Sequence, residues 1–445
     1  MSTDPTAEPI LDVRNLQTTF FTEKETIRAV DGVSFDIRPG ETVGVVGESG
    51  SGKSVTARSI MGLVDSPGRT LQGSSVRFTH LETVRDYASK FPDRTVDIDA
   101  LRADYDPVAL FGRDAIEITP TAFGYERAES VPLEDVLAAG YGEELGLVDD
   151  DPAVLVAAGS VDSPTDISDG FVELTHLRGK AQRLMRGGRI AMVFQDPLTS
   201  LNPVYTVGNQ IKESLRLHQG LRGKAATREA TELLEAVGIP DARRRVNEYP
   251  HQFSGWMQQR AVIAMALACE PEVLICDEPT TALDVTIQAQ ILDLLADLQE
   301  KRDLAMLFIT HDMGVIAEVA DRVNVMYAGE VVETADVNAL FADPSHPYTR
   351  GLLQSIPGRQ PGDRLQTIEG NVPTPNEPAT SCRFAPRCPK AFDECDAVHP
   401  VSVPVDDDGD DHTAACLLSP EHLSTEEAVA RHRRRNAKRN GGDTE

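Results

Sequence analysis

Residues 47–54 read Gly47-Glu48-Ser49-Gly50-Ser51-Gly52-Lys53-Ser54, and this stretch decides the fold. It follows a short apolar run, residues 42–46, which predicts a buried strand. Glycines at 47, 50 and 52 let the backbone curl closely around a phosphate group, where larger side chains would block the approach. The pattern therefore predicts a strand, then a phosphate-binding loop, then a helix that begins at Lys53.

The last two residues of the loop have the chemistry that a nucleoside triphosphate requires. Lys53 is placed to reach the β- and γ-phosphates, and the Ser54 hydroxyl is placed to ligate Mg²⁺. The positive end of the helix dipole faces the same phosphates. We predict a nucleoside triphosphate and its magnesium ion here. A chance glycine-rich turn is the alternative, which the Lys-Ser pair and the preceding strand disfavour.

A second apolar run, residues 273–276, predicts a buried strand that ends in two carboxylates. Asp277 is placed to hold the magnesium shell, and Glu278 can polarise a water for in-line attack on the γ-phosphate. Two capping carboxylates at a strand end are the plainer alternative, since Pro279 and Thr280 follow. Beside the phosphate loop, the catalytic interpretation is favoured.

With both segments in place, the chain resembles the ATP-binding cassette (ABC) family over about residues 10–78 and 170–390. Four short stretches match further motifs: the Q-loop glutamine Gln195, the signature turn Ser254-Gly255, the D-loop Ala282-Leu283-Asp284 and the switch histidine His311. The resemblance implies ATP and Mg²⁺ as ligands, and a Gln195 that senses magnesium and the membrane subunit. It also implies that Phe20 or Phe21 stacks on adenine, with a core phenylalanine as the alternative.

The resemblance implies an α/β fold, an ABC-type P-loop NTPase cassette with a mixed sheet core and a helical subdomain that carries the signature turn. We expect the ATPase domain at residues 1–330, with the helical subdomain at 206–268. A small Cys-rich C-terminal module at 331–420 and a loose tail at 421–445 complete the expected chain.

The family binds two ATP between two cassettes, each on one subunit's phosphate loop and under the other's signature turn. The family has two adjacent glycines after the signature serine, whereas this chain has Gly255 and then Trp256, its only tryptophan. Either the ring points away from the interface, or this signature is impaired. The second case would make the chain a regulatory or structural nucleotide-binding subunit that leaves hydrolysis mainly to its partner.

Two longer stretches resemble the ATPase subunits of dipeptide, oligopeptide and nickel importers. They are residues 194–203, from Phe194 to Pro203, and residues 346–357, which begin His346-Pro347-Tyr348-Thr349-Arg350. The resemblance implies a second ATPase subunit in a heterodimer, two permease subunits and an extracytoplasmic solute-binding protein. Peptides are the expected solute, with nickel or another solute as the alternative.

Four of the six cysteines crowd the C-terminal region: Cys382, Cys388, Cys395 and Cys416. Four thiolates suit an iron–sulfur cluster or a tetrahedral zinc ion, but their spacing is not that of a zinc ribbon. The importer group carries a similar tail, and the resemblance implies a [4Fe-4S] cluster. Zinc and free or paired thiols remain alternatives, with disulfides disfavoured in a reducing compartment.

The net charge of the chain indicates which classes of binding partner are disfavoured. The net charge of the 445-residue chain is -28, from 71 acidic and 43 basic residues, and this argues against nucleic acid as the main partner. So acidic a surface fits a halophilic source, with an acidic mesophile as the alternative. No apolar run reaches the roughly 18–20 residues of a membrane span, and the N-terminus lacks a signal-peptide core. We therefore expect a protein at the cytoplasmic face of the membrane, held there by permease subunits.

Residues 79–168 do not fit the cassette plan, because family members run almost directly from residues 76–78 to about residue 169. The insertion is acidic, and it includes Asp149-Asp150-Asp151. Residues 131–137 and 153–158 are apolar enough to form ordered elements. No chemistry is visible in it, and a surface elaboration beside the antiparallel sheet is the favoured interpretation.

Overall fold

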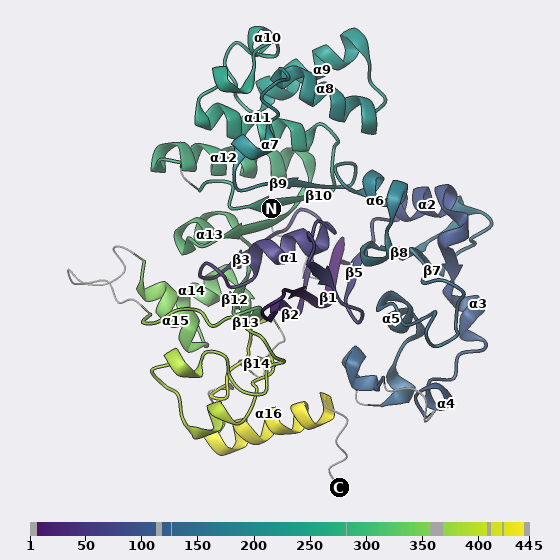
Figure 1. The fold of residues 1–445 in the computed structure, drawn as a ribbon, viewed down its shortest axis with the longest axis vertical. Helices are drawn as coiled ribbons and strands as arrows, with labels where there is room; N and C mark the ends of the chain where they lie inside the picture. Colours follow the sequence, from purple (N-terminus) through teal and green to yellow (C-terminus); the bar gives the residue numbers. More distant parts are fainter. Residues whose placement is uncertain are drawn as a thin grey trace.

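The computed structural model describes residues 7–112, 118–125, 127–281, 283–356, 368–406, 411–420 and 422–439. One of its two sheets has eight strands in the order β14-β15-β13-β12-β3-β11-β10-β9 (Figure 1). Five neighbouring strands are parallel: β12 (Arg322–Tyr327), β3 (Thr42–Val46), β11 (Ala305–Thr310), β10 (Val273–Asp277) and β9 (Ile190–Val193). The strands predicted at residues 42–46 and 273–276 are therefore confirmed.

The other sheet follows the order β2-β1-β5-β8-β7-β6, and β4 pairs with β1. Its strands are β1 (Leu11–Phe21), β2 (Thr26–Ile37), β4 (Gly68–Thr70), β5 (Ser75–Phe78), β6 (Thr95–Asp97), β7 (Val154–Ala158) and β8 (Asp169–Glu173). All these pairs are antiparallel except β6 with β7, so the sheet is mixed.

Helix α1 (Lys53–Ile60) begins where the sequence predicts and lies between the two sheets (Figure 1). The parallel strands are buried on both faces, so alternate residues enter two different cores. Ile275 and Leu307 share one core with Ala57 of α1, whereas Leu274 and Phe308 face the other, which contains α12 (Val285–Arg302) and α13 (Met313–Val319).

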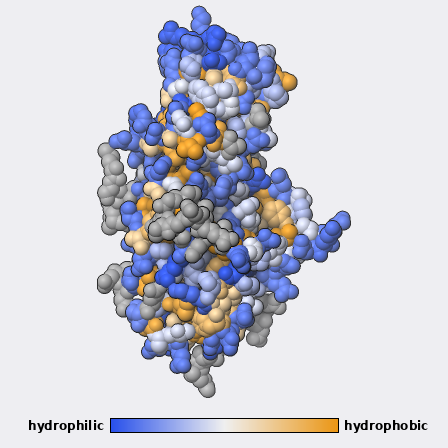
Figure 2. All heavy atoms as spheres, turned by 90° about the vertical axis from the view of Figure 1, so that its left-hand side faces the viewer, coloured by the Kyte–Doolittle hydropathy of each residue, from blue (hydrophilic) through white to orange (hydrophobic). Residues whose placement is uncertain are grey.

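The segment expected to be helical holds α8 (Val207–His218), α9 (Gly223–Ala236), α10 (Ala242–Arg245) and α11 (Gly255–Leu267), preceded by α7 (Pro197–Ser200). Thr206 starts α8 as its N-cap, since its hydroxyl accepts a hydrogen bond from the Asn209 amide at 3.3 Å. Apolar residues of these helices continue the core under β10. The helices form the top of the molecule in Figure 2, where most of the visible surface is hydrophilic and apolar residues gather in separate patches below.

The acidic segment 79–168, predicted to lie beside the antiparallel sheet, instead extends it through β6 and β7. The elements expected near residues 131–137 and 153–158 are confirmed as α5 (Leu133–Ala138) and β7. Its remaining α-helices are α2 (Leu81–Lys90), α3 (Ile98–Arg102) and α4 (Pro107–Phe111), and α6 (Gly179–Met185) follows β8. A buried ion pair at 2.5 Å between Arg77 of β5 and Asp135 of α5 fastens the segment to the sheet.

The Cys-rich region is continuous with the cassette sheet instead of forming a separate module. Strand β13 (Glu330–Asp336) pairs with β12 on one side and with β15 (Thr413–Ala414) on the other, and β15 pairs with β14 (Val403–Pro404). The boundary expected at residue 330 therefore falls at the start of a strand inside the sheet. Helices α14 (Val337–Ala342) and α15 (Pro347–Gln354) follow β13.

The tail expected to be loose contains α16 (Thr425–Arg439), so this expectation is wrong for those residues. A capping box starts the helix, because Ser424 and Glu427 exchange side chain–backbone hydrogen bonds at 3.0 and 3.4 Å. Val429 and His432 are buried, and the latter accepts a hydrogen bond from the Val401 amide at 3.2 Å. No helix among the described residues is long and apolar enough to cross a membrane.

Helix α15 begins at a buried histidine. His346 caps it, since its Nδ1 accepts a hydrogen bond from the Tyr348 amide at 3.0 Å, which requires a neutral ring. Burial lowers the pKa of His346 to about 4.

This cap predicts a pH-dependent loss of stability. The unfolded chain gains a proton at His346 as the pH falls from about 6.5 to about 4, whereas the folded chain does not, so the free energy of unfolding drops by about 3 kcal/mol over that window. His346→Asn keeps a capping side chain and should remove this part of the slope. Urea unfolding of both proteins at pH 7 and pH 5 checks it, and parallel losses would contradict the assignment.

Candidate active site

The phosphate loop lies between β3 and α1, and its glycines are required by its shape. Gly50 and Gly52 have φ values of 84° and 104°, which L side chains rarely adopt. A Cβ at Gly47 would lie 2.2 Å from the Met326 carbonyl oxygen, so no larger residue fits there. The backbone can thus surround a phosphate, as the sequence predicts.

Lys53 is buried under this loop. Its Nζ donates hydrogen bonds to the carbonyl oxygens of Gly47 at 2.8 Å and Glu48 at 2.9 Å. Burial lowers the pKa of Lys53, and the carboxylates of Glu278 and Asp277 partly oppose this effect. The ammonium is therefore held where a phosphate on the loop would meet it.

Ser54 and Asp277 meet beside the lysine. The Ser54 hydroxyl donates to Asp277 Oδ1 at 2.8 Å, and Asp277 is the last residue of β10. Burial raises the pKa of Asp277, and the nearby charge of Glu278 adds to this effect. A hydroxyl and a buried carboxylate are the hard oxygen ligands that Mg²⁺ prefers, so this pair fits the predicted ion.

Glu278 follows Asp277 and is held by three side chains. Its carboxylate accepts hydrogen bonds from Gln195 Nε2 at 3.0 Å and from the Thr281 hydroxyl at 2.9 Å, and its Oε1 lies 3.3 Å from His311 Nδ1. The φ value of Glu278 is 50°, in the left-handed region that non-glycine residues rarely occupy, and such strain is concentrated at functional sites. The structure thus brings together the three residues predicted to be catalytic.

Topology explains this convergence. Gln195, Asp277 and His311 lie at or just after the carboxyl ends of β9, β10 and β11, and the loop follows the carboxyl end of β3. These strands are parallel and adjacent, so their ends meet at one edge of the sheet, where ligands of such sheets bind. Thr281 was not predicted, although its position three residues after Glu278 was a signal.

Other predicted residues lie at the starts of helices and on the antiparallel sheet. Ser254 and Gly255 are exposed at the start of α11, and Asp284 caps α12 by accepting a hydrogen bond from the Ile287 amide at 3.0 Å. Phe20 packs against Gly68 on the antiparallel sheet. Phe21 is 41% exposed, with the Arg69 guanidinium 4.3 Å from its ring centre. Ala282 and Pro357 lie outside the described residues. Stacking on adenine stays a prediction for Phe20.

Trp256 lies at the start of α11 and is half-buried against the core of the helical region. The guanidinium of Arg260, one turn later, lies 5.4 Å from the centre of the ring. A Cβ built on the neighbouring Gly255 would meet no atom within 4 Å, so the backbone of the turn is open to an approaching ligand. This arrangement favours the alternative in which the indole points away from the interface.

The four C-terminal cysteines lie close enough to interact electrostatically. Burial, reinforced by the neighbouring thiols, raises the pKa of Cys416 to about 12 and that of Cys382 to about 11. Cys395 belongs to a small apolar cluster with Ala385, Val398, Leu417 and Val429. Within the described residues, no three His, Cys, Asp or Glu side chains are arranged as ligands of a metal ion. Four thiols are ligands that suit a thiophilic metal, but their sulfur atoms are not arranged around a common centre.

Two family profiles match this chain, one over the cassette and one over the C-terminal region. A family profile described as "ABC transporter" matches residues 30–106 and 161–281, which leaves residues 107–160 of the insertion unmatched. A second profile, "Oligopeptide/dipeptide transporter, C-terminal region", matches residues 332–395.

Several curated proteins are similar over most of their length. The oligopeptide transport ATP-binding protein AppD of Bacillus subtilis is 42% identical over 387 residues, 87% of this chain and 90% of that protein. A probable peptide ABC transporter ATP-binding protein of Sinorhizobium fredii is 40% identical over 423 residues, 95% and 98% of the two chains. Among solved structures, the dimeric cassette MJ0796 bound to ADP and Pi matches 74% of this chain and 98% of its own, with a TM-score of 0.47 and 22% identity.

Proposed function

Because the chain belongs to the ATP-binding proteins of the oligopeptide and dipeptide ABC transporters, we propose that it is the ATP-hydrolysing subunit of a peptide importer. The observation that carries this proposal is the position of Glu278, fixed by Gln195, Thr281 and His311 beside the phosphate loop. A base held at this edge of the sheet suits a water-activating role. We infer peptides as the solute from the printed names of the relatives, with nickel or another solute as the alternative.

Each residue of the site has a proposed part in hydrolysis. Lys53 and the backbone amides of the loop bind the β- and γ-phosphates, and Ser54, Asp277 and Gln195 hold Mg²⁺, which neutralises charge on the phosphates when bound. Glu278 takes a proton from the attacking water, and His311 orients the Glu278 carboxylate through the 3.3 Å contact.

A partner cassette completes the proposed site. Ser254 and Gly255 are exposed, and among the described residues no recorded hydrogen bond joins either of them to the phosphate loop of the same chain. This supports a dimer in which each ATP lies under the other subunit's signature turn, and we propose a heterodimer with a second ATPase. We further propose that two permease subunits hold this chain at the cytoplasmic face of the membrane, and that an extracytoplasmic solute-binding protein is the remaining partner.

Purification from detergent-solubilised membranes tests the assembly and the solute together. A complex with a second ATPase and two permeases is expected, and in vesicles its ATPase activity should rise with peptide-loaded binding protein. Stimulation by nickel or another solute but not by peptides would overturn the solute assignment alone. Purified protein that is associated with no membrane protein would overturn the proposal that the chain belongs to an importer.

The competing proposal, a regulatory subunit with an impaired signature, rests on Trp256 alone. Because the indole packs inward beside Arg260, we expect Trp256→Gly to change ATP turnover per complex by less than about twofold. The variant should still lose about 1–2 kcal/mol of stability, through a helical glycine and lost packing. ATPase assays and thermal unfolding measure the two effects, with Trp256→Phe as the control that keeps the packing. A clear rise in turnover, abolished when the partner's catalytic glutamate is removed, would support the regulatory reading instead.

We further propose that Cys382, Cys388, Cys395 and Cys416 hold one [4Fe-4S] cluster, with zinc as the alternative. Cys395 and Cys416 are buried and Cys382 and Cys388 are half-buried, and burial together with neighbouring thiols raises the pKa of Cys382 and Cys416. A bound cation would stabilise such thiols as thiolates, which supports a metal over free thiols. When bound, the cluster would fasten loops that pack in a small apolar cluster around Cys395 and, through Phe384, against the main core.

The negative charge of the chain supports one further proposal, which concerns the kind of organism that the protein comes from. With a net charge of -28, the folded chain repels itself at low ionic strength, and concentrated salt screens this repulsion. We therefore propose a halophilic source. Stability that falls as salt is raised from low to molar concentrations would contradict it.

A further inference from the structure

Two residues of the C-terminal region hold the phosphate loop from outside, at Glu48. The Glu48 amide donates a hydrogen bond to the Tyr348 hydroxyl at 2.9 Å, and the Glu48 Oε2 atom lies 3.0 Å from Arg387 Nη2. Tyr348 and Arg387 are 300 and 339 residues away from Glu48 in the sequence. Both ends of this loop residue, its amide and its carboxylate, are therefore bound by the C-terminal region.

Neither contact belongs to a mobile surface side chain. The ring of Tyr348 is fully buried and packs against Tyr327 at 4.7 Å and Phe384 at 5.4 Å between centroids. The side chain of Arg387 is only 6% exposed, and it donates to the carbonyl oxygens of Glu369 at 2.9 Å and Gly370 at 3.1 Å. Groups fixed in this way can position the loop instead of following it.

The held residue lies close to the proposed ATP site. The Glu48 carbonyl oxygen accepts from Lys53 Nζ at 2.9 Å, and the Glu48 carboxylate acts electrostatically on the same ammonium. The second carboxylate oxygen, Oε1, is buried and has no hydrogen-bond partner among the described residues. Arg387 thus supplies the ion pair of the Glu48 carboxylate, in addition to the longer-range attraction of Lys53. Without it, a loose negative charge would lie beside the triphosphate.

We propose that Arg387 and Tyr348 are positioning residues that hold the phosphate loop in its nucleotide-binding shape, so that the C-terminal region sets the affinity for ATP. The inference rests on the proposed function in that this loop is taken as the ATP site. Arg387 directly precedes Cys388, which is one of the four C-terminal cysteines (the cysteine quartet). The residue that contacts the phosphate loop is therefore the chain neighbour of a cysteine of the quartet. A change in the position of Cys388 would therefore also shift Arg387, and with it the ion pair between Arg387 and Glu48.

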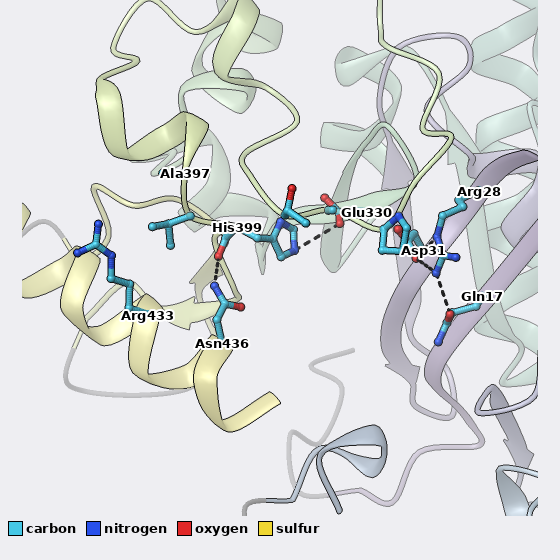
Figure 3. A pocket seen from close by; sticks show the side chains of 12 residues that line it. Gln17, Arg28, Asp31, Glu330, Ala397, His399, Arg433 and Asn436 are labelled. Carbon is cyan, nitrogen blue, oxygen red and sulfur yellow. Dashed lines mark hydrogen bonds and ion pairs between the residues drawn. The ribbon is translucent and has the colours of Figure 1, made fainter. Parts of the chain in front are cut away.

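The chain contains a matched control for a merely structural role. Arg383, four residues earlier, is also buried and also joins the C-terminal region to the cassette, through ion pairs with Asp31 and Glu330. Asp31 and Glu330 line a cavity of about 410 Å³ between α16 and strands β1 and β2 (Figure 3), and Arg383 also donates to the Ala328 carbonyl oxygen at 2.7 Å. Replacing either arginine removes ion pairs between the C-terminal region and the cassette. Of the two arginines, only Arg387 contacts the phosphate loop.

The test compares Arg387→Met with Arg383→Met in the full chain, by titrating a fluorescent ATP analogue with Mg²⁺. We expect the Kd of Arg387→Met to rise about tenfold, the cost of one charge-assisted hydrogen bond, and that of Arg383→Met to rise less than about twofold. In the assembled complex the KM for ATP should rise likewise, with kcat at saturating ATP nearly unchanged. Arg387→Lys should restore part of the affinity.

Tyr348→Phe keeps the buried ring and removes only the hydroxyl, so it tests the second contact in a protein that folds. Its Kd should rise about fivefold, as for loss of one neutral hydrogen bond. The double variant Glu48→Gln/Arg387→Met should bind the ATP analogue no more weakly than the single variant with the higher Kd, because both substitutions remove the same ion pair. Equal effects of the two arginine variants, or an unchanged Kd in Arg387→Met, would overturn the inference. A wild-type chain that binds no ATP analogue would instead overturn the proposed function.

Discussion

Glu278→Gln is expected to keep ATP binding and to lower ATP turnover of the assembled complex by about 100-fold or more, as loss of a positioned general base does. The amide is nearly isosteric with the carboxylate and can still contact Gln195 and Thr281, so the fold of the site should persist. What the variant loses is the capacity to take a proton from water. Nucleotide titration and steady-state ATPase assays measure the two parts separately.

Glu272 offers a matched control, because it precedes the same strand β10 at the opposite end and pairs with Arg189 at 2.7 Å. Glu272→Gln should leave turnover nearly unchanged. Near-normal ATPase activity in the Glu278→Gln complex would show that another group activates the water. Loss of nucleotide binding in Glu278→Gln would show that the residue is structural.

The second large effect concerns the cysteine quartet. Protein purified without oxygen should be brown and hold about four iron atoms per chain, and Cys416→Ser should lose the colour and most of the iron. The variant should also unfold at a lower temperature, since metal binding contributes to the stability of a small, loop-rich region. Iron analysis, the visible absorption spectrum and thermal unfolding together measure these changes.

Cys269→Ser is the control, because Cys269 is buried just after helix α11, away from the four C-terminal cysteines in the sequence, and burial raises its pKa to about 12. Its iron content should equal that of the wild type. Colourless wild-type protein with one zinc per chain would replace the cluster with the zinc alternative. Wild-type protein that binds neither metal would leave the cysteines as free or paired thiols.

Much of the nucleotide site could be predicted because its parts are local in the sequence. A glycine-rich loop between an apolar run and a helix, and two carboxylates after a second apolar run, each imply their own backbone shape. Their convergence also followed, since parallel strands end at one edge of a sheet. The left-handed backbone of Glu278 could not be predicted, because it depends on how neighbouring strands fix the turn.

The errors fell where pairing between distant segments decides the structure. Strand β7 joins the antiparallel sheet because its apolar residues match those of β8, which no local pattern in the acidic insertion reveals. The tail predicted to be loose contains helix α16, in which Ser424 and Glu427 form a capping box and Val429 packs against the cysteine region. Packing against a distant part of the chain therefore orders a segment near the end of the sequence.

The sequence by itself determined the chemistry of this protein: a phosphate loop ending in Lys53 and Ser54, a carboxylate pair at residues 277 and 278, and four clustered cysteines. Only the tertiary structure decided how that chemistry is held. The contacts of Tyr348 and Arg387 with Glu48 span at least 300 residues, and hydrogen bonds over such separations leave no periodicity or spacing in the chain. Local motifs follow from backbone geometry, whereas the contacts between the C-terminal region and the phosphate loop arise from the packing of Tyr348 and Arg387 against strand β12 and the Cys-rich region.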